Sequence, residues 1–428
     1  MKALVVVARG LHLGYIGCYG NEWVQTPALD RLAAEGIVFD QHYADQPDAA
    51  GADRAWQTGC YHFPPLKPED DLPGQEPRSL FGVLGEHAIA TFLVYDERNR
   101  VHPATPADWR HSYPLELAGE GSLLPERVSD AMSQALMRLA PREQWLLTFD
   151  VGILLQSAEC WADAAAGEED GRIEPASVSD DSLCGELLEP EDIAHCQLQD
   201  RYASLVTCLD SALGRGVQEL ERRGLLDEML IIVTSDRGQK LGEDRTRLAS
   251  QLFLHEELIH IPLIVRLPGK EGAGRRIAAL TQSIDILPTL FDAFGVPLPA
   301  VHGHSILPLA RGEKDLLRPY ACAGLRTGDT VEWALRSAEW AFLLPASDSA
   351  PYSPTESELY VKPEDRWEVN NVRQHHLEFA EGLEQTLRRF MEATARLGPL
   401  QPPELPHQEA VEEQQDQSVE SAGRSIPI

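Results

Sequence analysis

The sequence predicts an α/β fold, in which helices sandwich a mainly parallel central sheet and a smaller C-terminal α+β subdomain follows. Its 428 residues, 43% of them hydrophobic, are enough to bury one large core and one smaller core. Short apolar runs recur between helical patterns, and runs without polar alternation are typical of strands covered on both faces. The runs are Leu4 to Val7, Ala90 to Val94, Trp145 to Phe149, Met229 to Thr234 and Ile261 to Arg266.

The segment from Asp200 to Arg223 has the spacing of an amphipathic helix and ends near Gly224. The apolar run from Met229 to Val233 follows it, so the two segments predict one helix-to-strand unit of the α/β domain. The helical spacing is carried by Tyr202, Leu205, Leu209, Leu213, Val217 and Leu220.

Composition predicts how the chain is divided. We expect residues 1–316 to form the α/β domain, with an acidic surface insertion at 161–192, where eleven Asp or Glu accompany a single Arg. Residues 317–398 predict the smaller subdomain, because strand-like stretches precede a helical pattern there. Residues 399–428 are rich in Pro, Glu and Gln and predict a disordered tail. The subdomain elements are expected at Thr330 to Leu335, Trp340 to Leu344 and, for the helix, His376 to Leu397.

The charge balance argues against several partners. The 37 basic and 68 acidic residues leave a formal charge of −31, which repels nucleic acid and anionic membranes. No run approaches the roughly 20 apolar residues of a membrane-spanning helix. The apolar start from Met1 to Ala8 passes directly into Arg9 without a cleavage site, so it predicts a first buried strand and a cytoplasmic protein. The seven cysteines lack the spacing of a disulfide framework or a zinc site.

Motif blocks extend in order over about residues 1 to 395. They are Ile16 to Gly20, Thr26 to Gly36, Arg54-Ala55 with Thr58-Gly59, Arg201 to Ser204, Val233 to Gly238, Glu256-Glu257, Asp285 to Leu290, and Glu358 to Tyr360 before Asn370-Asn371. Together these blocks resemble the sulfatase family, within the alkaline-phosphatase-like superfamily. The resemblance implies that fold and the hydrolysis of sulfate esters. Such enzymes use a formylglycine made from Cys or Ser, beside a divalent cation, usually calcium, that carboxylates hold.

The positions that match the family's active site carry other residues. The family's C-x-P-S-R motif aligns with Ala50 to Arg54, so Ala50 stands at the nucleophile position while Arg54 is retained. Cys60, the nearest thiol, follows the motif on the wrong side of Arg54. Arg9 replaces an acidic ligand after the first strand. The second metal element survives as Ser235-Asp236-Arg237-Gly238, which keeps Asp236 but has Arg237 beside it. The windows at Tyr95 to Arg98, Gly152 to Leu154 and near Gln251 also lack the family's polar groups.

These replacements predict a catalytically inactive pseudosulfatase with a binding, scaffold or regulatory role. We expect no cofactor and no bound metal, with Asp236 as the one retained ligand position. Arg9 and Arg237 either pair with Asp236 in place of the metal or turn to solvent. Together with Arg54 they also predict a pocket for a sulfated or phosphorylated ligand; a protein partner is the other expectation.

The alternative is an active sulfuric or phosphoric ester hydrolase with altered catalytic groups, which would require calcium. Its available polar side chains are His255, Glu256, Glu257, His302 and His304, and the last two are expected in a surface loop. Ser235 lacks the Gly-x-Ser-x-Gly context of a nucleophile elbow.

Overall fold

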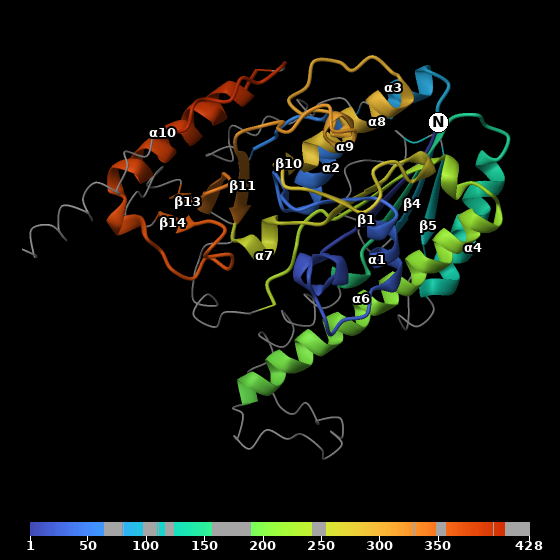
Figure 1. Cartoon of the computed structure of the whole chain (residues 1–428), viewed down its shortest axis with the longest axis horizontal. Coiled ribbons are helices and arrows are strands. Elements are labelled where there is room, and N and C mark those ends of the chain that lie inside the picture. The colour runs from blue at the N-terminus through green and yellow to red at the C-terminus, as the bar shows by residue number, and fades with distance from the viewer. Residues whose placement is uncertain are drawn as a thin grey trace, which may run out of the picture.

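An eight-stranded sheet lies at the centre of the larger domain (Figure 1). The structure is a computed structural model, and it describes residues 1–63, 79, 81–96, 109, 111–115, 124–155, 190–241, 254–327, 330–347, 357–396 and 398–406. The strand order is β5-β4-β6-β1-β7-β8-β2-β9. The strands are β1 (Lys2–Ala8), β2 (Ile37–Phe39), β4 (Ala90–Asp96), β5 (His111–Leu115), β6 (Trp145–Val151), β7 (Met229–Thr234), β8 (Leu263–Arg266) and β9 (Arg275–Ile277).

Strands β5, β4, β6, β1 and β7 run parallel, whereas β8 is antiparallel to both of its neighbours, β7 and β2. Each of the five predicted apolar runs forms a strand of this sheet. The predicted fold class, a mainly parallel sheet between helices, is therefore confirmed.

Helices cover both faces of the sheet (Figure 1). The helices are α1 (Pro27–Ala34), α2 (Ala49–Thr58), α3 (Phe81–Glu86), α4 (Leu124–Leu139), α6 (Pro190–Arg222), α7 (Glu256–Ile259), α8 (Ile286–Phe294), α9 (Leu307–Ala310) and, in the subdomain, α10 (Leu377–Thr394).

Alternate side chains of β1 contact two different cores. Leu4 and Val6 pack with residues of α1, α4 and α6, whereas Val5 and Val7 pack with residues of α2, α3 and α8. Because both faces are covered, the strand needs apolar residues at successive positions. The absence of polar alternation in the sequence follows from this packing.

Helix α6 is longer than predicted, since it begins at Pro190 and not at Asp200. Residues 195–200 are exposed or only half-buried, so the apolar spacing that marks the C-terminal part does not extend to them. The first turns of α6 project beyond the rest of the domain (Figure 1). The predicted acidic insertion lies outside the described residues apart from the start of this helix.

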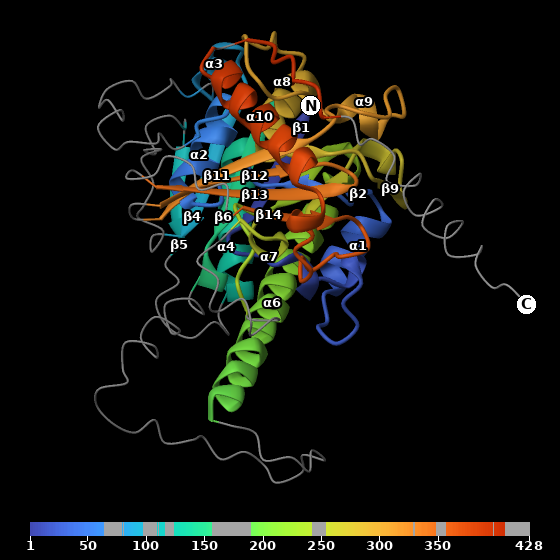
Figure 2. The ribbon, with the colours of Figure 1, turned by 90° about the vertical axis from the view of Figure 1, so that its left-hand side faces the viewer.

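The smaller subdomain is a four-stranded antiparallel sheet with α10 packed against it (Figure 2). Leu383, Leu387 and Phe390 of α10 contact Trp333 and Phe342 of the sheet core. The predicted strands and helix of this region are present. The strands are β11 (Ala321–Thr327), β12 (Thr330–Arg336), β13 (Trp340–Ser347) and β14 (Glu358–Val361); a separate parallel pair joins β3 (His42–Tyr43) and β10 (Thr281–Gln282).

The tail was predicted to begin too early. Tyr320 Oη donates a hydrogen bond to the Pro403 carbonyl at 2.8 Å, and Thr386 Oγ1 donates to the Glu404 carbonyl at 3.0 Å. These contacts attach residues 399–406 to the subdomain, although their composition resembles that of a solvated segment. Residues 407–428 lie outside the described part of the chain.

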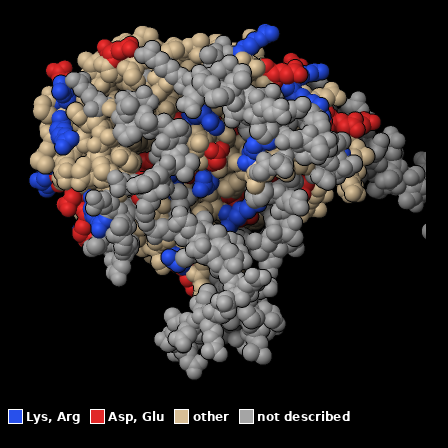
Figure 3. Space-filling view, turned by 180° about the vertical axis from the view of Figure 1, so that it is seen from behind, with Lys and Arg blue, Asp and Glu red and all other residues tan. Residues whose placement is uncertain are grey.

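Surface charge is mixed on the face opposite to that of Figure 1. Figure 3 shows acidic and basic side chains interspersed there in small groups. The net negative charge therefore does not prevent local positive sites. Among the described residues, no helix combines the length and apolarity needed to cross a bilayer.

Candidate functional site

Three neighbouring parallel strands bring the candidate residues together at one edge of the sheet. Arg9 follows β1, Asp150 lies at the end of β6, and Asp236 follows β7. The register pairs Val7 of β1 with Asp150 on one side and with Thr234 on the other. The carboxyl ends of parallel strands are where α/β sheets place their ligand sites.

The guanidinium of Arg9 is the centre of this strand-end cluster. Its Nε and Nη2 donate to the two carboxylate oxygens of Asp150, both at 2.6 Å. Nη2 also donates to Asp53 Oδ1 at 2.7 Å, and Nη1 lies 3.6 Å from Asp236 Oδ2. Arg9 is 1% exposed, and its guanidinium carbon lies 5.7 Å from the centre of the Trp56 ring. One buried cation thus contacts three carboxylates.

Helix α2 positions Asp53. Asp48 caps the helix by accepting a hydrogen bond from the Gly51 amide at 2.8 Å. Gly51 allows the first turn to approach Gln46, since a Cβ there would lie 2.3 Å from the Gln46 side chain. Ala50 lies in this first turn and offers only a methyl group, while Asp53 follows in the same helix and reaches Arg9.

The carboxylates keep Arg9 charged. Burial alone would lower the pKa of Arg9, but the attraction of Asp150, Asp53 and Asp236 outweighs burial and raises that pKa well above its ordinary value. Asp236 is also held in place, because its Oδ1 accepts a hydrogen bond from the Gly10 amide at 2.8 Å.

The structure places both predicted guanidinium groups beside Asp236. Arg9 and Arg237 lie 3.6 and 3.7 Å from its Oδ2, and Arg237 is about one quarter exposed. The shortest contacts of Arg9, however, are to Asp150 and Asp53, which the sequence analysis did not identify. Asp150 directly follows a predicted strand, and Asp53 directly precedes the retained Arg54, so both had a positional signal.

Calcium does not fit at the position of the Arg9 guanidinium. Calcium requires six to eight oxygen ligands at about 2.3–2.6 Å. Here the carboxylates of Asp53, Asp150 and Asp236 face a guanidinium, and a cation among them would lie against that positive charge. Within the described ranges, no group of three or more His, Cys, Asp or Glu side chains is arranged to hold a metal.

Arg54 contributes less to the cluster than the register suggested. It lies on α2 and is half-buried, and no described residue hydrogen-bonds its Nε. Burial and the charge of Arg54 lower the pKa of the nearby His62 to about 4. Three carboxylates neutralise Arg9. The remaining cations of the predicted anion pocket are therefore Arg54 and Arg237.

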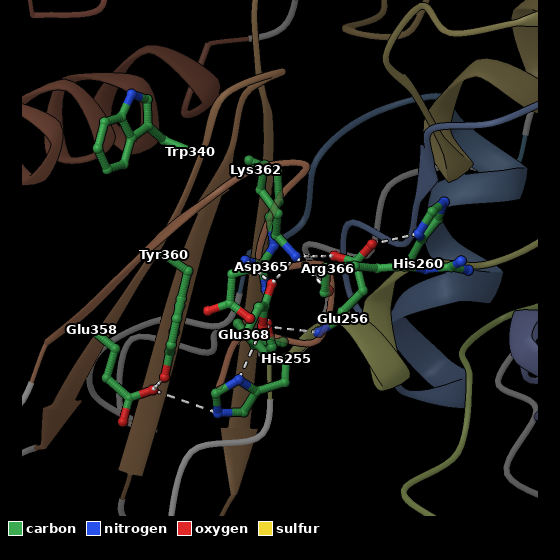
Figure 4. A network of polar contacts seen from close by, with 12 residues as sticks. His255, Glu256, His260, Trp340, Glu358, Tyr360, Lys362, Asp365, Arg366 and Glu368 are labelled. Carbon is green, nitrogen blue, oxygen red and sulfur yellow. Dashed lines mark hydrogen bonds and ion pairs between the residues drawn. The ribbon is translucent and has the colours of Figure 1, made fainter. Parts of the chain in front are cut away.

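The side chains considered for an altered hydrolase have structural contacts. His302 is 2% exposed, so the predicted surface loop is wrong for this residue. Its Nδ1 accepts from the Tyr61 amide at 3.1 Å, and its Nε2 donates to the Arg396 carbonyl at 2.9 Å. The half-buried His304 donates its amide to Asp285 at 2.8 Å. His255 and Glu256 belong to a buried ionic network at the subdomain boundary (Figure 4).

Asp45, which precedes α2, is a buried acid with little compensation. It is 1% exposed, and no other residue in the described part of the chain hydrogen-bonds its carboxylate. Burial, reinforced by Asp48 and Asp285, raises its pKa to about 7, although a backbone hydrogen bond and Arg318 oppose the shift. The native state therefore binds the Asp45 proton more tightly than the unfolded chain does.

We expect Asp45→Asn to stabilise the protein in a pH-dependent way. Burial of the Asp45 carboxyl does not lower the free energy of unfolding below its unfolded pKa of about 3.8. Above that pH the loss of stability grows until the pH passes the folded pKa of about 7. Asparagine imitates the neutral carboxyl, so the gain should reach up to about 4 kcal/mol near pH 8 and less than half of that near pH 5. Denaturant unfolding of both proteins at the two pH values measures this difference. Equal effects at both values would show that Asp45 does not titrate in this way.

Comparisons with known proteins agree with the fold described above. A family model described as Sulfatase matches residues 154–296. In this region the chain is similar to the sulfatase family, within the alkaline-phosphatase-like superfamily. A solved structure of BT1596, a 2-O GAG sulfatase, covers 95% of this chain and 98% of its own, with a TM-score of 0.72 at 16% identity. This structural likeness shows that the sulfatase fold extends over nearly the whole chain.

Curated sulfatases are similar over parts of the chain. Mouse Steryl-sulfatase is 24% identical over 438 residues, which cover 79% of this chain and 69% of that protein. Bovine Arylsulfatase K is 28% identical over 200 residues, which cover 44% of this chain but only 36% of that protein. The aligned stretch thus spans about a third of the length of Arylsulfatase K. Ala50 lies in the first turn of α2, and Arg9 directly follows β1.

Proposed function

We propose that this protein is a catalytically inactive member of the sulfatase family with a binding or regulatory role, in which Arg9 takes the place of the divalent cation. The observation that carries the proposal is the buried Arg9 guanidinium, which has two 2.6 Å bonds to Asp150 and one 2.7 Å bond to Asp53. A guanidinium neutralises carboxylates, but it does not provide the open coordination position at which a metal polarises an ester oxygen.

The nucleophile position supports the same proposal. Ala50 has no atom that could attack sulfur or become a formylglycine. Cys60 lies beyond the C-terminal end of α2, and it is 3% exposed. Burial raises the pKa of its thiol, which disfavours the thiolate that a nucleophile requires.

The alternative, a hydrolase that uses His255 and Glu256, has weaker support. His255 Nδ1 lies 3.0 Å from Glu368, and Glu256 contacts both His260 and Lys362. These contacts occupy the side chains that such a mechanism would need.

We expect no hydrolysis of a chromogenic aryl sulfate or aryl phosphate above background. The assay uses purified protein with and without added calcium, beside an Asp236→Ala control. Calcium-dependent turnover in the unmodified protein that is lost in the control would contradict the proposal, because Asp236 occupies the retained ligand position.

A further inference from the structure

A cavity of about 250 Å³ lies between the larger domain and the C-terminal subdomain, and the strand-end cluster does not line it. Tyr43 and Gln41 line it from the larger domain; Ser337 and Lys362 line it from the turn after β12 and the segment after β14. A water molecule occupies about 30 Å³ of liquid, so the cavity is large enough for a small organic molecule. Ligand sites occur preferentially at such domain boundaries.

The lining is more cationic than the whole chain. Three cationic side chains face two carboxylates. The cations are Arg276, Lys362 and Arg366, and the carboxylates are those of Asp40 and Glu256. His260 also lines the cavity, and its Nδ1 lies 2.6 Å from Glu256 Oε1 while its Nε2 lies 2.7 Å from the Asp40 carbonyl.

Arg366 is the cation that remains available to a ligand. Arg276 pairs with Asp40, and Lys362 Nζ lies 3.2 Å from Glu256 and 3.0 Å from Glu368 (Figure 4). Arg366 is exposed, and its guanidinium carbon lies 5.0 Å from the Trp367 ring centre. Among the residues that the structure describes, it has no carboxylate partner.

A buried donor at the neighbouring small cavity supplies a second, independent observation. His12 lines this cavity together with Glu256, His260 and Arg366, which also line the larger one. His12 is 2% exposed, and its Nδ1 accepts a hydrogen bond from the Gly14 amide at 2.9 Å. The proton of the neutral ring is therefore on Nε2, and this buried nitrogen has no hydrogen-bond partner within the described part of the chain.

An acceptor completes the set of polar groups. Gln41 lines the larger cavity, and its buried Oε1 has no hydrogen-bond partner among the residues that the structure describes. Buried polar atoms are nearly always hydrogen-bonded, so an unpaired donor and an unpaired acceptor at two cavities that share lining residues indicate a missing partner with both capacities.

We propose that this boundary cavity binds a small molecule that carries an oxyanion and a hydroxyl group. The oxyanion binds Arg366, because guanidinium groups form charge-assisted hydrogen bonds with carboxylate, phosphate and sulfate. His12 Nε2 donates to an oxygen of the ligand, and Gln41 Oε1 accepts from its hydroxyl. The proposal is independent of the activity of the strand-end cluster, since binding is measured without turnover.

Isothermal titration calorimetry with glycolate, inorganic sulfate and inorganic phosphate tests the proposal. We expect saturable binding of at least one of these oxyanions, weakened tenfold or more in Arg366→Gln. Tightest binding of glycolate identifies a hydroxy-carboxylate site, and tightest binding of phosphate identifies a tetrahedral oxyanion with a hydroxyl. Tightest binding of sulfate, which has no hydroxyl at neutral pH, would contradict the contact to Gln41. The matched control is Arg222→Gln, which changes an exposed arginine on α6 and should bind as the unmodified protein does. Equal affinity in Arg366→Gln, or no saturable binding of any probe, would overturn the proposal.

Discussion

Replacing Arg9 with methionine is expected to destabilise the native state by about 3–5 kcal/mol, because removal of one partner from a buried ion pair leaves uncompensated charge. Methionine keeps much of the side-chain length but leaves Asp53, Asp150 and Asp236 without the guanidinium between them. Denaturant unfolding at neutral pH measures the loss. Arg222→Met is the matched control, and it should change stability little, since Arg222 pairs at the surface with Glu219 on the same helix.

The destabilisation should respond to pH and to calcium. Without Arg9, repulsion among three buried carboxylates raises their pKa values, so the loss should be larger near neutral pH than in mild acid. The smaller substitution Arg9→Ser should make room for a cation, and added calcium should then raise the melting temperature of that variant more than that of the unmodified protein. A loss below about 1 kcal/mol for Arg9→Met would mean that the ion pairs are not what neutralises these carboxylates.

Glu368→Gln is expected to destabilise the native state by a similar amount, about 3–5 kcal/mol, because Glu368 is the buried centre of the network at the subdomain boundary. Its Oε2 accepts from His255 at 3.0 Å and from the Glu256 amide at 3.1 Å. Its Oε1 lies 2.5 Å from Arg336 and 3.0 Å from Lys362. The backbone of Glu368 has a φ of 59°, a conformation that costs energy for a residue other than glycine and that these contacts hold.

The pH dependence of this effect has a defined sign. Burial would raise the pKa of Glu368, but Arg336, His255 and Lys362 lower it well below its usual range. The native carboxylate therefore stabilises the protein above the unfolded pKa, near 4.5, and this contribution is lost as the pH falls toward the folded value. The difference between the unmodified protein and Glu368→Gln should be full at neutral pH and shrink in acid. The exposed Glu364 in the same loop provides the control Glu364→Gln, and an equal effect of both substitutions would contradict the role of Glu368.

The strands that the sequence predicted each carry their signal locally, whereas β2, β5 and β9 of the central sheet were not predicted. The run from Met229 to Thr234 has the bounds of β7. The start of α6 was not predictable from apolar spacing, because residues 195–200 are exposed or only half-buried. The attachment of residues 399–406 was also missed, since it uses their backbone carbonyls, which composition does not report.

The candidate site was predictable in part. The motif order pointed to Arg9, Asp236 and Arg237, because each stands at a position of the resemblance. The partnership of Arg9 with Asp150 joins residues 141 positions apart, and only the sheet register brings them together. The boundary cavity could not be predicted from the sequence, because Arg366 follows β14 while His12 follows β1, and no local pattern links the two.

A crystal soaked in calcium is the most direct test of the replacement of the metal by Arg9. We predict electron density for the Arg9 guanidinium between Asp53, Asp150 and Asp236, and no anomalous signal beside them. A calcium ion coordinated by Asp236, with the Arg9 side chain displaced, would contradict that replacement.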